Sequence, residues 1–565
     1  MIGSAEIEVP DLPVYDVLRT TAGAHPHNIV YEYLGHAVTY KELLEYVDDL
    51  SLHFRKMGIR EGDRVTISLP NCPQALVSFY ALNRIGAISV MVHPLSSKNE
   101  IEFYIKDSGS KMAITLGKFC DNFPKIRSIE GFQTLIVTSP VDMMPFIVGK
   151  LMQARYKDSR TPKVRLGSGT VLWKKMMRDD VDHVSKDMPE VTADMPASIL
   201  YTGGTTGWNK GAVHSSRSFN AAAYGMVELS GLLGEGDTML AELPMFHGFG
   251  LCTCVHLPIC IGLRIILVPT FTIDSLCKTI VNKRINFIAG VPTLYEKFVD
   301  NEHLSNTDLS FLKGLFCGGD FMSIEAKERV DSFLAEHGCT TKIRIGYGCT
   351  ECLSATAITP KNGERPGSVG VPIPGFDYKI VRIDTVDEVS DGEEGEICMC
   401  GPSVMRGYHN NTAETENVLK LHDDGRTWLH TGDVGCIEDG YIYFRYRIKR
   451  IIITSGYNVY PNQIEEVLDH HPLIDSSCVI GIPDNLRGSR VRAVIVLKKG
   501  VEATQDIQKS IMAFVKDNIS AYAKPREYAF VKSLPMTKLG KVDYRCLEES
   551  AASESGTDQS SSSRM

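Results

Sequence analysis

Short runs in which apolar and polar residues alternate fill the first half of the chain, and helix-like stretches separate them. In residues 63–69 the apolar side chains recur at every second position, which is the period of a β-strand. Residues 73–85 carry a helix-like apolar pattern that stops at Gly86, and residues 87–92 are strand-like again. This β-α-β order predicts an α/β fold with mostly parallel sheets that helices cover.

Further apolar runs continue the pattern. The longest of them, residues 249–271, is interrupted by His256, Pro258 and Arg264, so it predicts a buried helix followed by a strand and not a membrane span. The shorter strand-like runs lie at 111–116, 134–138 and 264–268.

Residues 141–190 break this rhythm. They mix basic and apolar residues, as in KLMQARYKDSRTPK at 150–163, and no clear period runs through them. We interpret this stretch as a surface insertion or connection, and we expect a solvated pair of helices there in preference to a binding patch.

A second change of pattern comes near residue 445. The run RYRIKR at 445–450 packs four positive charges into six residues between two structured segments. Beyond it, Pro461 opens a predicted helix with an apolar stripe at Ile464, Val467 and Leu468. Strand-like segments follow at 476–482 and 491–497.

These changes predict three parts. They are a large N-terminal domain (residues 1–447), a small α+β C-terminal domain (448–550) and a disordered Ser-rich tail (551–565). A chain of 565 residues is long enough for more than one domain, and 43% hydrophobic with 23% charged residues is ordinary globular composition.

The charge and cysteine content exclude several functional classes. A formal net charge of −9 argues against a nucleic acid or an anionic membrane as the main partner. The fifteen cysteines are odd in number and scattered, which indicates a reducing compartment and no disulfide framework. Cys349 and Cys352 form one C-x-x-C pair, but no second pair follows at zinc spacing, so we expect no metal or redox role for it. The acidic N-terminus has no apolar core and predicts no secretory signal.

The strongest chemical signal is the segment SILYTGGTTGWNKG at 198–211. Its glycines let the backbone turn tightly and bring N–H groups close to an anion, while its threonines add hydroxyl donors. Lys210 adds a positive charge suited to a polyphosphate. The loop is not a Walker A motif, because the lysine precedes Gly211 and the chain runs on into another strand-like segment, residues 212–214.

This loop resembles the phosphate loop of the adenylate-forming superfamily, which includes acyl- and aryl-CoA synthetases. Four further segments match in the same order, and together they span about residues 30–550, so the chain is identified as a member of that superfamily. The TGGTTG form of the loop is most similar to the fatty-acyl-CoA ligase branch. The four segments are GYGCTE (346–351), TGDVG (431–435), RYRIKRIIITSGYNVYPNQIEEVL (445–468) and PMTKLGKVD (535–543).

The resemblance implies a two-step reaction. A carboxylate attacks the α-phosphorus of ATP to give an acyl-AMP and pyrophosphate, and the thiol of CoA then displaces AMP. The carboxylate is already ionised at neutral pH, so no general base is needed. ATP, Mg²⁺ and CoA are therefore the expected substrates and cofactor, and no redox cofactor is expected.

The resemblance also assigns residues to the adenylation step. Lys541 bridges the substrate carboxylate and the α-phosphate, Thr350 contacts that phosphate, and Glu351 is the Mg²⁺ ligand. Tyr347 offers a ring face to adenine and Asp433 accepts from the ribose hydroxyls. The ATP- and AMP-binding residues implied are Thr202, Gly203, Gly204, Thr205, Thr206, Gly207, Lys210, Gly318, Gly319, Tyr347, Gly348, Asp433 and Arg447.

The remaining assignments concern the thiol step and the acid. Lys449 matches the hinge about which the family rotates its C-terminal domain. Gly456 and Tyr457 match the CoA tunnel, and His247 matches a histidine beside the acyl pocket. That pocket is expected to use His247, Val291, Gly318, Ile345 and Gly346.

Of the positions that depart from the family pattern, two bear on local structure. Tyr446 replaces a small or polar residue before Arg447, which puts the local backbone path in question. Asp320 stands where an apolar or small residue is common, and we interpret it as a cap of the helix predicted over residues 322–330.

The leading hypothesis is an acyl-CoA ligase acting on a fatty, aryl or other apolar carboxylic acid. The alternatives are an adenylation enzyme that loads a free-standing carrier-protein thiol and a non-catalytic acyl- or nucleotide-binding relative. We expect a cytoplasmic protein, with the peroxisome as the alternative because of the terminal Ser-Arg-Met. The sequence does not give the oligomeric state, and a homodimer stays open.

Overall fold

The computed structural model describes most of the 565 residues, and the chain divides into two compact units. The first unit comprises residues 1–388, 398–431 and 437–442, and the second comprises 389–397, 432–436 and 443–565. Outside the described residues lie 4, 126–127, 146–147, 150–168, 186, 203–208, 232–233, 235, 455–456, 485–487, 520–522, 538–540 and 552–565.

The first unit contains a seven-stranded sheet. Its core strands are parallel, and its last two elements in the chain form an antiparallel hairpin at one edge. In order across the sheet the strands are β10 (Lys210–Ser215), β9 (Pro196–Thr202), β5 (Ile88–Met91), β4 (Arg64–Ser68), β6 (Met112–Leu116), β7 (Thr134–Thr138) and β8 (Thr170–Leu172).

A nine-stranded sheet forms the second framework of this unit. Six adjacent strands are parallel, and antiparallel strands complete both edges. In order these are β17 (Val371–Pro372), β16 (Ala355–Ile358), β15 (Ile343–Gly348), β14 (Gly314–Cys317), β13 (Phe287–Gly290), β11 (Thr238–Ala241), β12 (Arg264–Leu267), β2 (Ile29–Tyr33) and β3 (His36–Thr39).

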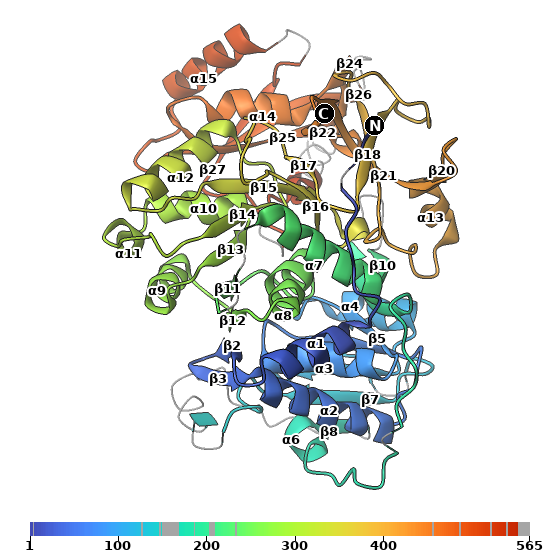
Figure 1. Ribbon diagram of the computed structural model, residues 1–565. Helices are drawn as coiled ribbons and strands as arrows, with labels where there is room; N and C mark the ends of the chain where they lie inside the picture. The colour runs from blue at the N-terminus through green and yellow to red at the C-terminus, as the bar shows by residue number, and fades with distance from the viewer. Residues whose placement is uncertain are drawn as a thin grey trace, which may run out of the picture. The chain divides into compact units, whose positions relative to one another are not determined.

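Helices pack on both sheets. One group comprises α1 (Val14–Ala24), α2 (Tyr40–Lys56), α3 (Pro73–Arg84), α7 (Ser216–Ser230) and α8 (Leu257–Cys260). Within this group, α7 contacts β10 of the first sheet and β16 of the second. Figure 1 shows α7 and α8 on one side of strands β11–β15 and a second group on the other side. That second group is α9 (Ile273–Lys283), α10 (Pro292–Val299), α11 (Glu302–Ser305) and α12 (Ile324–Glu336), which share one apolar core with the sheet.

Other helices are short or cover the seven-stranded sheet. Residues of α4 join the apolar core on one face of that sheet, and Trp173 of α6 is 2% exposed. No helix in the described part of the chain is both long and apolar enough to cross a membrane. These elements are α4 (Lys98–Ser108), η1 (Gly117–Asn122), α6 (Trp173–Met176), the π-helix η3 (Phe249–His256), η4 (Thr350–Cys352) and α13 (Thr412–Val418).

The chain crosses from one unit to the other within strands of a six-stranded sheet. β19, β21 and β22 each have residues in both units. β21 lies between β19 and β20, and β22 also pairs with β21. The strands are β1 (Ile2–Gly3), β18 (Asp377–Val381), β19 (Gly395–Cys400), β21 (Thr427–Glu438), β20 (Leu419–Leu421) and β22 (Tyr441–Arg447).

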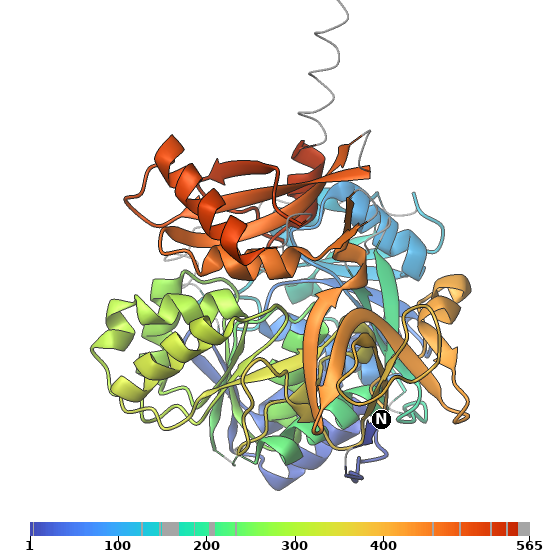
Figure 2. The same cartoon turned by 90° about the horizontal axis from the view of Figure 1, so that it is seen from above.

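The second unit has its own five-stranded sheet. Two helices pack on one face of it through Ile464, Leu468, Ile511 and Val515, and Figure 2 shows both helices beside these strands. The elements are β23 (Ile452–Thr454), β24 (Tyr457–Val459), α14 (Pro461–Asp469), β25 (Ile474–Asp484), β26 (Gly488–Leu497), α15 (Gln505–Asn518), β27 (Glu527–Val531) and the short η5 (Ile448–Arg450).

The predicted α/β class is confirmed, with mostly parallel sheets and helices in the larger unit and a small sheet-containing unit after it. The predicted strands at 63–69, 111–116, 134–138 and 264–268 are all present, and Gly86 has φ +68° after α3. The helix predicted from Pro461 is α14, and Ile464 and Leu468 are buried in it.

Three expectations need correction. Residues 170–176 are not a solvated insertion, because β8 extends the seven-stranded sheet and the Trp173 side chain is buried. The helix predicted in 249–271 begins as a π-helix, since the run is apolar on all sides and no stripe specifies its period. Asp320 is not the cap of α12, because Ser323 accepts the Ala326 N–H at 3.1 Å in that role.

Candidate functional site

The phosphate loop joins two strands that pair in register. Thr202 ends β9, Lys210 begins β10, and their Cα positions lie opposite each other in the antiparallel ladder. The connecting residues Gly203, Gly204, Thr205, Thr206 and Gly207 lie outside the described residues. The strand on each side of the loop is as predicted, and the loop therefore begins and ends at neighbouring points of one sheet edge.

Lys210 lies in a polar cluster with residues far along the chain. Its ammonium forms an ion pair with Glu414 of α13 and stands 4.9 Å from the centroid of the Tyr408 ring. The Tyr408 hydroxyl in turn donates to Glu351 Oε1 at 2.6 Å. Tyr408 is 7% exposed, and burial together with the nearby Glu351 carboxylate raises the pKa of its phenol. Tyr408 thus links the predicted phosphate-binding lysine to the predicted Mg²⁺ ligand.

A buried histidine fixes the backbone beside Glu351. His214 on β10 is fully buried, and burial lowers the pKa of its imidazole to about 4. The neutral ring donates from Nε2 to the Thr350 carbonyl oxygen at 2.8 Å. The Met405 N–H donates to the Glu351 carbonyl oxygen at 2.7 Å. The carbonyl oxygens of Thr350 and Glu351 are therefore held by a side chain and a backbone N–H from two separate segments, and the Thr350 side chain takes no part in these bonds.

The turn that carries these residues allows no side chain at Gly348. A Cβ there would lie 2.0 Å from the Ser354 carbonyl oxygen. Leu353, between them, has φ +73°, a conformation that is uncommon for a residue with a side chain. The turn from β15 into η4 is therefore tightly constrained.

The residues predicted for the acyl pocket follow adjacent parallel strands of the nine-stranded sheet. His247 lies beyond β11, Val291 follows β13, Gly318 follows β14, and Gly346 is on β15. Because parallel strands end at the same edge of a sheet, these positions lie along one edge, where α/β proteins commonly bind ligands. The Gly318 N–H donates to the Gly290 carbonyl oxygen at 3.1 Å, which ties two of these strand ends together.

Glycines at this edge differ in how much room they have. A Cβ on Gly290 would lie 2.8 Å from Leu294 Cδ2, and one on Gly318 would lie 3.1 Å from the Gly346 carbonyl oxygen. A Cβ on Gly346 would meet its nearest atoms, in Ala355 and Ile358, at 3.4 Å, an ordinary contact distance. Gly319 has φ +85°, a backbone conformation that residues with a side chain rarely adopt, so glycine is favoured there whatever the space around it.

Sequence reasoning missed Phe249, the first residue of the π-helix. Its ring lies 3.6 Å from where a Cβ of Gly318 would stand, so it lines the same strand edge. π-helical turns occur often at functional sites. Tyr347, by contrast, is 8% exposed with its ring 6.5 Å from that of Tyr378, and its predicted contact with adenine stays a prediction.

A buried carboxyl group follows β11. Glu242 is 6% exposed, and neither of its carboxyl oxygens has a hydrogen-bond partner among the described residues. Burial raises the pKa of this group to about 8. Glu242 is therefore protonated at neutral pH, five residues before His247.

In the second unit, two of the predicted ribose ligands bind each other. Arg447 donates from Nε to Asp433 Oδ1 at 2.7 Å and from Nη2 to Oδ2 at 3.3 Å. Gly432, with φ +70°, donates its N–H to Glu396 Oε1 at 2.9 Å and so fixes the turn before Asp433. Tyr446 does not divert the backbone, because β22 continues through it to Arg447.

The predicted catalytic lysine lies in a closed turn. The Thr537 N–H donates to the Lys541 carbonyl oxygen, and the Lys541 N–H donates back to Thr537 Oγ1 at 3.2 Å. The three residues between them, 538–540, are outside the described part. Two hydrogen bonds therefore hold Thr537 and Lys541 together.

The predicted hinge Lys449 lies in η5, next to a residue that the sequence analysis did not select. Arg450 donates to Glu465 Oε1 at 2.7 Å and to Asn462 Oδ1 at 3.0 Å, and so joins η5 to α14. In the CoA-tunnel segment, Gly456 lies outside the described residues and the backbone of Tyr457 begins β24.

Comparison with known proteins agrees with this architecture. The family model described as "AMP-binding enzyme" matches residues 18–409, and the model of its C-terminal domain matches residues 463–541. The chain belongs to the AMP-binding enzyme family. Each matched span holds predicted site residues of this family: Lys210 and Glu351 lie in the first and Lys541 in the second.

Named relatives of this family cover nearly the whole chain. A long-chain-fatty-acid–CoA ligase of Bacillus subtilis is 31% identical over 550 residues, which cover 96% of this chain and 95% of the relative. A peroxisomal OPC-8:0-CoA ligase of Arabidopsis thaliana is 30% identical and covers 97% of this chain and 95% of its own length. ATP-bound MatB from Rhodopseudomonas palustris is 24% identical with a TM-score of 0.79, covers 96% of this chain and 99% of its own, and shows the shared fold.

Proposed function

We propose that this protein is an ATP-dependent, AMP-forming acyl-CoA ligase. It activates an apolar carboxylic acid as acyl-AMP with release of pyrophosphate, and then transfers the acyl group to CoA. Relatives named as fatty-acid–CoA ligases over almost the full chain support this reading.

One structural observation carries the proposal. Strand β15 and the turn after it bring the predicted acyl-pocket residues Ile345 and Gly346 within a few residues of Thr350 and Glu351. An acid lying along this edge would have its carboxylate beside the groups proposed for the phosphates. Holding the two anions together supplies much of the rate enhancement, because the bimolecular step becomes effectively intramolecular.

The residues divide the chemistry as follows. Lys210 contributes positive charge at the end of the phosphate loop. Lys541 neutralises the charge that develops on the α-phosphate during its transfer. Thr350 donates to the same phosphate through its hydroxyl group. After adenylation, the hinge at Lys449 exchanges the lysine turn for the CoA tunnel at Gly456 and Tyr457.

The residues present fit a magnesium ion. Glu351 offers a carboxylate, the hard oxygen ligand that Mg²⁺ prefers, and the Tyr408 hydroxyl orients it through Oε1. When bound, Mg²⁺ supplies positive charge to the polyphosphate. Tyr408 is therefore proposed as the residue that holds the ligand in place.

The acid is proposed to be a fatty acid, with an aryl or other apolar acid as the alternative within the same class. No lysine or arginine is among the positions predicted for the pocket, and glycine at positions 318 and 346 places no side chain there that would hinder an apolar chain. The cytoplasm, with the peroxisome as the alternative, stays the proposed compartment.

The test is release of pyrophosphate that depends on ATP and Mg²⁺, measured across a panel of carboxylic acids with and without CoA. We expect turnover that is specific for apolar acids and continues only with CoA. Lys541→Ala should abolish it, and Lys532→Ala, an exposed lysine of the same unit, should not. Turnover that is indifferent to CoA would favour a carrier-protein thiol, and binding of ATP without pyrophosphate release would favour a non-catalytic relative.

A further inference from the structure

Three buried side chains with soft or borderline ligand atoms converge at one point of the six-stranded sheet. Cys398 is fully buried, and His422 and His430 are each 4% exposed. One ligand atom from each residue lies within 4.8 Å of the other two. Neither the proposed ligase reaction nor the residues assigned to it use this group.

The sheet brings the three residues together from separate strands. Cys398 is on β19 and His430 is on the neighbouring strand β21. β20 pairs with β21 on its other side, with Leu421 opposite Thr427, and His422 is the next residue after β20. The two histidines thus lie on the two arms of one hairpin, beside a thiol from the adjacent strand.

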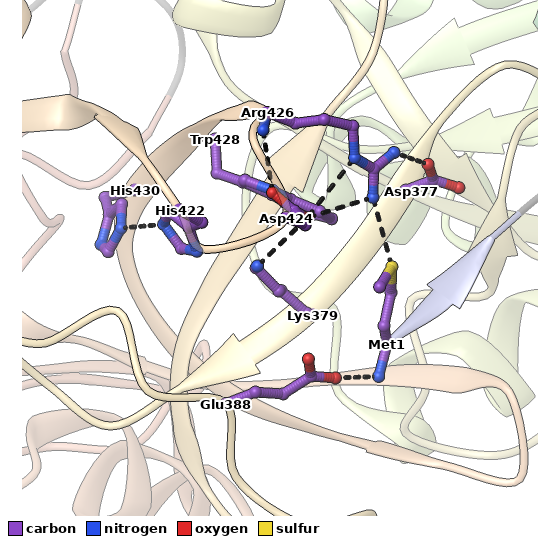
Figure 3. Close-up of polar contacts among 9 residues, drawn as sticks. All are labelled: Met1, Asp377, Lys379, Glu388, His422, Asp424, Arg426, Trp428 and His430. Carbon is purple, nitrogen blue, oxygen red and sulfur yellow. Dashed lines mark hydrogen bonds and ion pairs between the residues drawn. The ribbon is translucent and has the colours of Figure 1, made fainter.

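The imidazoles face each other directly. His422 Nε2 and His430 Nε2 are 2.9 Å apart, and Figure 3 shows the two rings edge to edge. Two neutral imidazoles at this distance share one N–H hydrogen between them. His422 Nδ1 is buried without a hydrogen-bond partner among the described residues. Hydrogen bonds within the described part of the protein therefore satisfy only one of the two ring nitrogens of His422, and they do not explain why this ring is buried here.

The surroundings are apolar on one side and charge-balanced on the other. Cys398 packs in a small apolar cluster with Val381 and Trp428. The ammonium of Lys379 lies 4.2 Å over the Trp428 ring and 3.5 Å from the Asp424 carboxylate, which offsets its charge. Figure 3 shows this ion pair on one side of His422 and His430 on the other side.

We propose that Cys398, His422 and His430 form a zinc-binding site. A thiolate and two imidazoles are ligands that zinc prefers, and three protein ligands leave a fourth tetrahedral position for water. Two nitrogen ligands on tetrahedral zinc lie about 3.3 Å apart, so the imidazoles need to separate by only about 0.4 Å.

Binding has a defined proton balance. The Cys398 thiol gives up its proton to become a thiolate, and that proton leaves to solvent. The hydrogen shared between the two Nε2 atoms moves to the Nδ1 atom of the ring that carried it, so that both Nε2 lone pairs face the ion. One proton is therefore released for each zinc ion bound.

The ion would fasten the β20–β21 hairpin to β19. His430 precedes the segment Thr431-Gly432-Asp433 on the same strand, so the site fixes β21 just before the predicted ribose-binding aspartate. Its role is structural, and it does not depend on the acid that the enzyme activates.

The experiment uses the full chain, freed of any affinity tag and of CoA, because polyhistidine and thiols bind zinc themselves. Zinc per chain is measured by mass spectrometry after equilibration with buffered zinc and gel filtration. Cobalt is then substituted as a spectroscopic probe of thiolate ligation. The variants are Cys398→Ser and His422→Gln, with Cys339→Ser as a control at a buried thiol in another core.

We expect one zinc ion and one released proton per chain in the wild type and in Cys339→Ser. The cobalt form should show a thiolate-to-cobalt charge-transfer band and intense visible bands typical of tetrahedral cobalt. Both variants of the site should lose the ion and the bands. Zinc should raise the melting temperature of the wild type but not of Cys398→Ser, which keeps the size of the side chain and is expected to fold.

Two results would overturn the proposal. One is a wild-type chain that retains far less than one zinc ion. The other is a Cys398→Ser chain that binds zinc as the wild type does, since the metal would then lie elsewhere. If His422→Gln fails to fold, Cys398→Ser alone decides the outcome.

Discussion

Replacing Glu242 with glutamine should flatten part of the pH dependence of unfolding. The buried carboxyl group has a pKa raised from 4.5 to about 8 because its charged form is poorly solvated. Between these values the folded state holds one more proton than the unfolded state. Stability therefore falls as the pH rises through this window, and the fall ends above about pH 8.

The size of the effect follows from the same shift. The free energy of unfolding drops by about 1.4 kcal/mol for each pH unit while the two states differ by one proton. From pH 6 to pH 8 the wild type should lose about 2 kcal/mol relative to Glu242→Gln, allowing for partial ionisation near the pKa. In a unit of roughly 430 residues this corresponds to about 2 °C in melting temperature.

The assay is thermal unfolding of the wild type and Glu242→Gln at both pH values in buffers of matched ionic strength. Glu328→Gln, an exposed glutamate on α12, controls for the loss of a carboxylate as such. The stability of the wild type relative to Glu242→Gln should be about 2 kcal/mol lower at pH 8 than at pH 6. Its stability relative to Glu328→Gln should be the same at both pH values. An equal gap at both pH values would refute the argument that burial keeps Glu242 protonated.

Three further predictions test contacts in the first unit. Tyr408→Phe removes a hydrogen bond, worth about 1.5–3 kcal/mol, to the Glu351 carboxylate. Initial-rate kinetics should therefore show the KM for Mg·ATP raised about tenfold while the fold is retained. An unchanged KM would exclude the proposal that Tyr408 orients Glu351. Gly348→Ala places a methyl group against the Ser354 carbonyl and should destabilise the fold by about 3 kcal/mol, as denaturant unfolding would report; a stability like that of the wild type would contradict the tight turn. Arg344 is 4% exposed and donates to the carbonyl oxygens of Thr359, Ser230 and Leu229. Arg344→Met should lower the free energy of unfolding by about 3–5 kcal/mol, because it leaves these carbonyl oxygens unpaired. Lys342→Met, at an exposed side chain, should be nearly neutral when unfolding is measured in the same way.

Local patterns in the sequence were sufficient for most of the large sheets. The run at 134–138 coincides with β7, because five consecutive residues of a buried parallel strand are apolar or β-branched. β8 was missed because its three residues follow a basic, irregular stretch and gain their place only by pairing with β7. The π-helix was missed because apolar residues surround it on all sides, so one period looks like another.

The candidate site shows the same limit. Glu351 was identified from a short motif, but its partner Tyr408 is 57 residues away and nothing near Tyr408 signals the contact. His214 and the group Cys398, His422 and His430 were also missed, because spacing along one segment cannot report residues that meet across strands. Asp320 and Ser323 are both good capping residues, and only the backbone geometry selects Ser323.

Gly290, Gly318 and Gly346, at one edge of the nine-stranded sheet, differ in how much space surrounds them. This difference bears on how the substrate of the enzyme could change during evolution. An added methyl group at Gly290 or Gly318 would press on a neighbouring side chain or carbonyl, so either substitution would cost fold stability. At Gly346 the same methyl group meets its neighbours at ordinary contact distance. If Gly346 lines the acyl pocket, as we propose, a change in a single codon there would favour a shorter acid without the strain that the same change causes at Gly290 or Gly318.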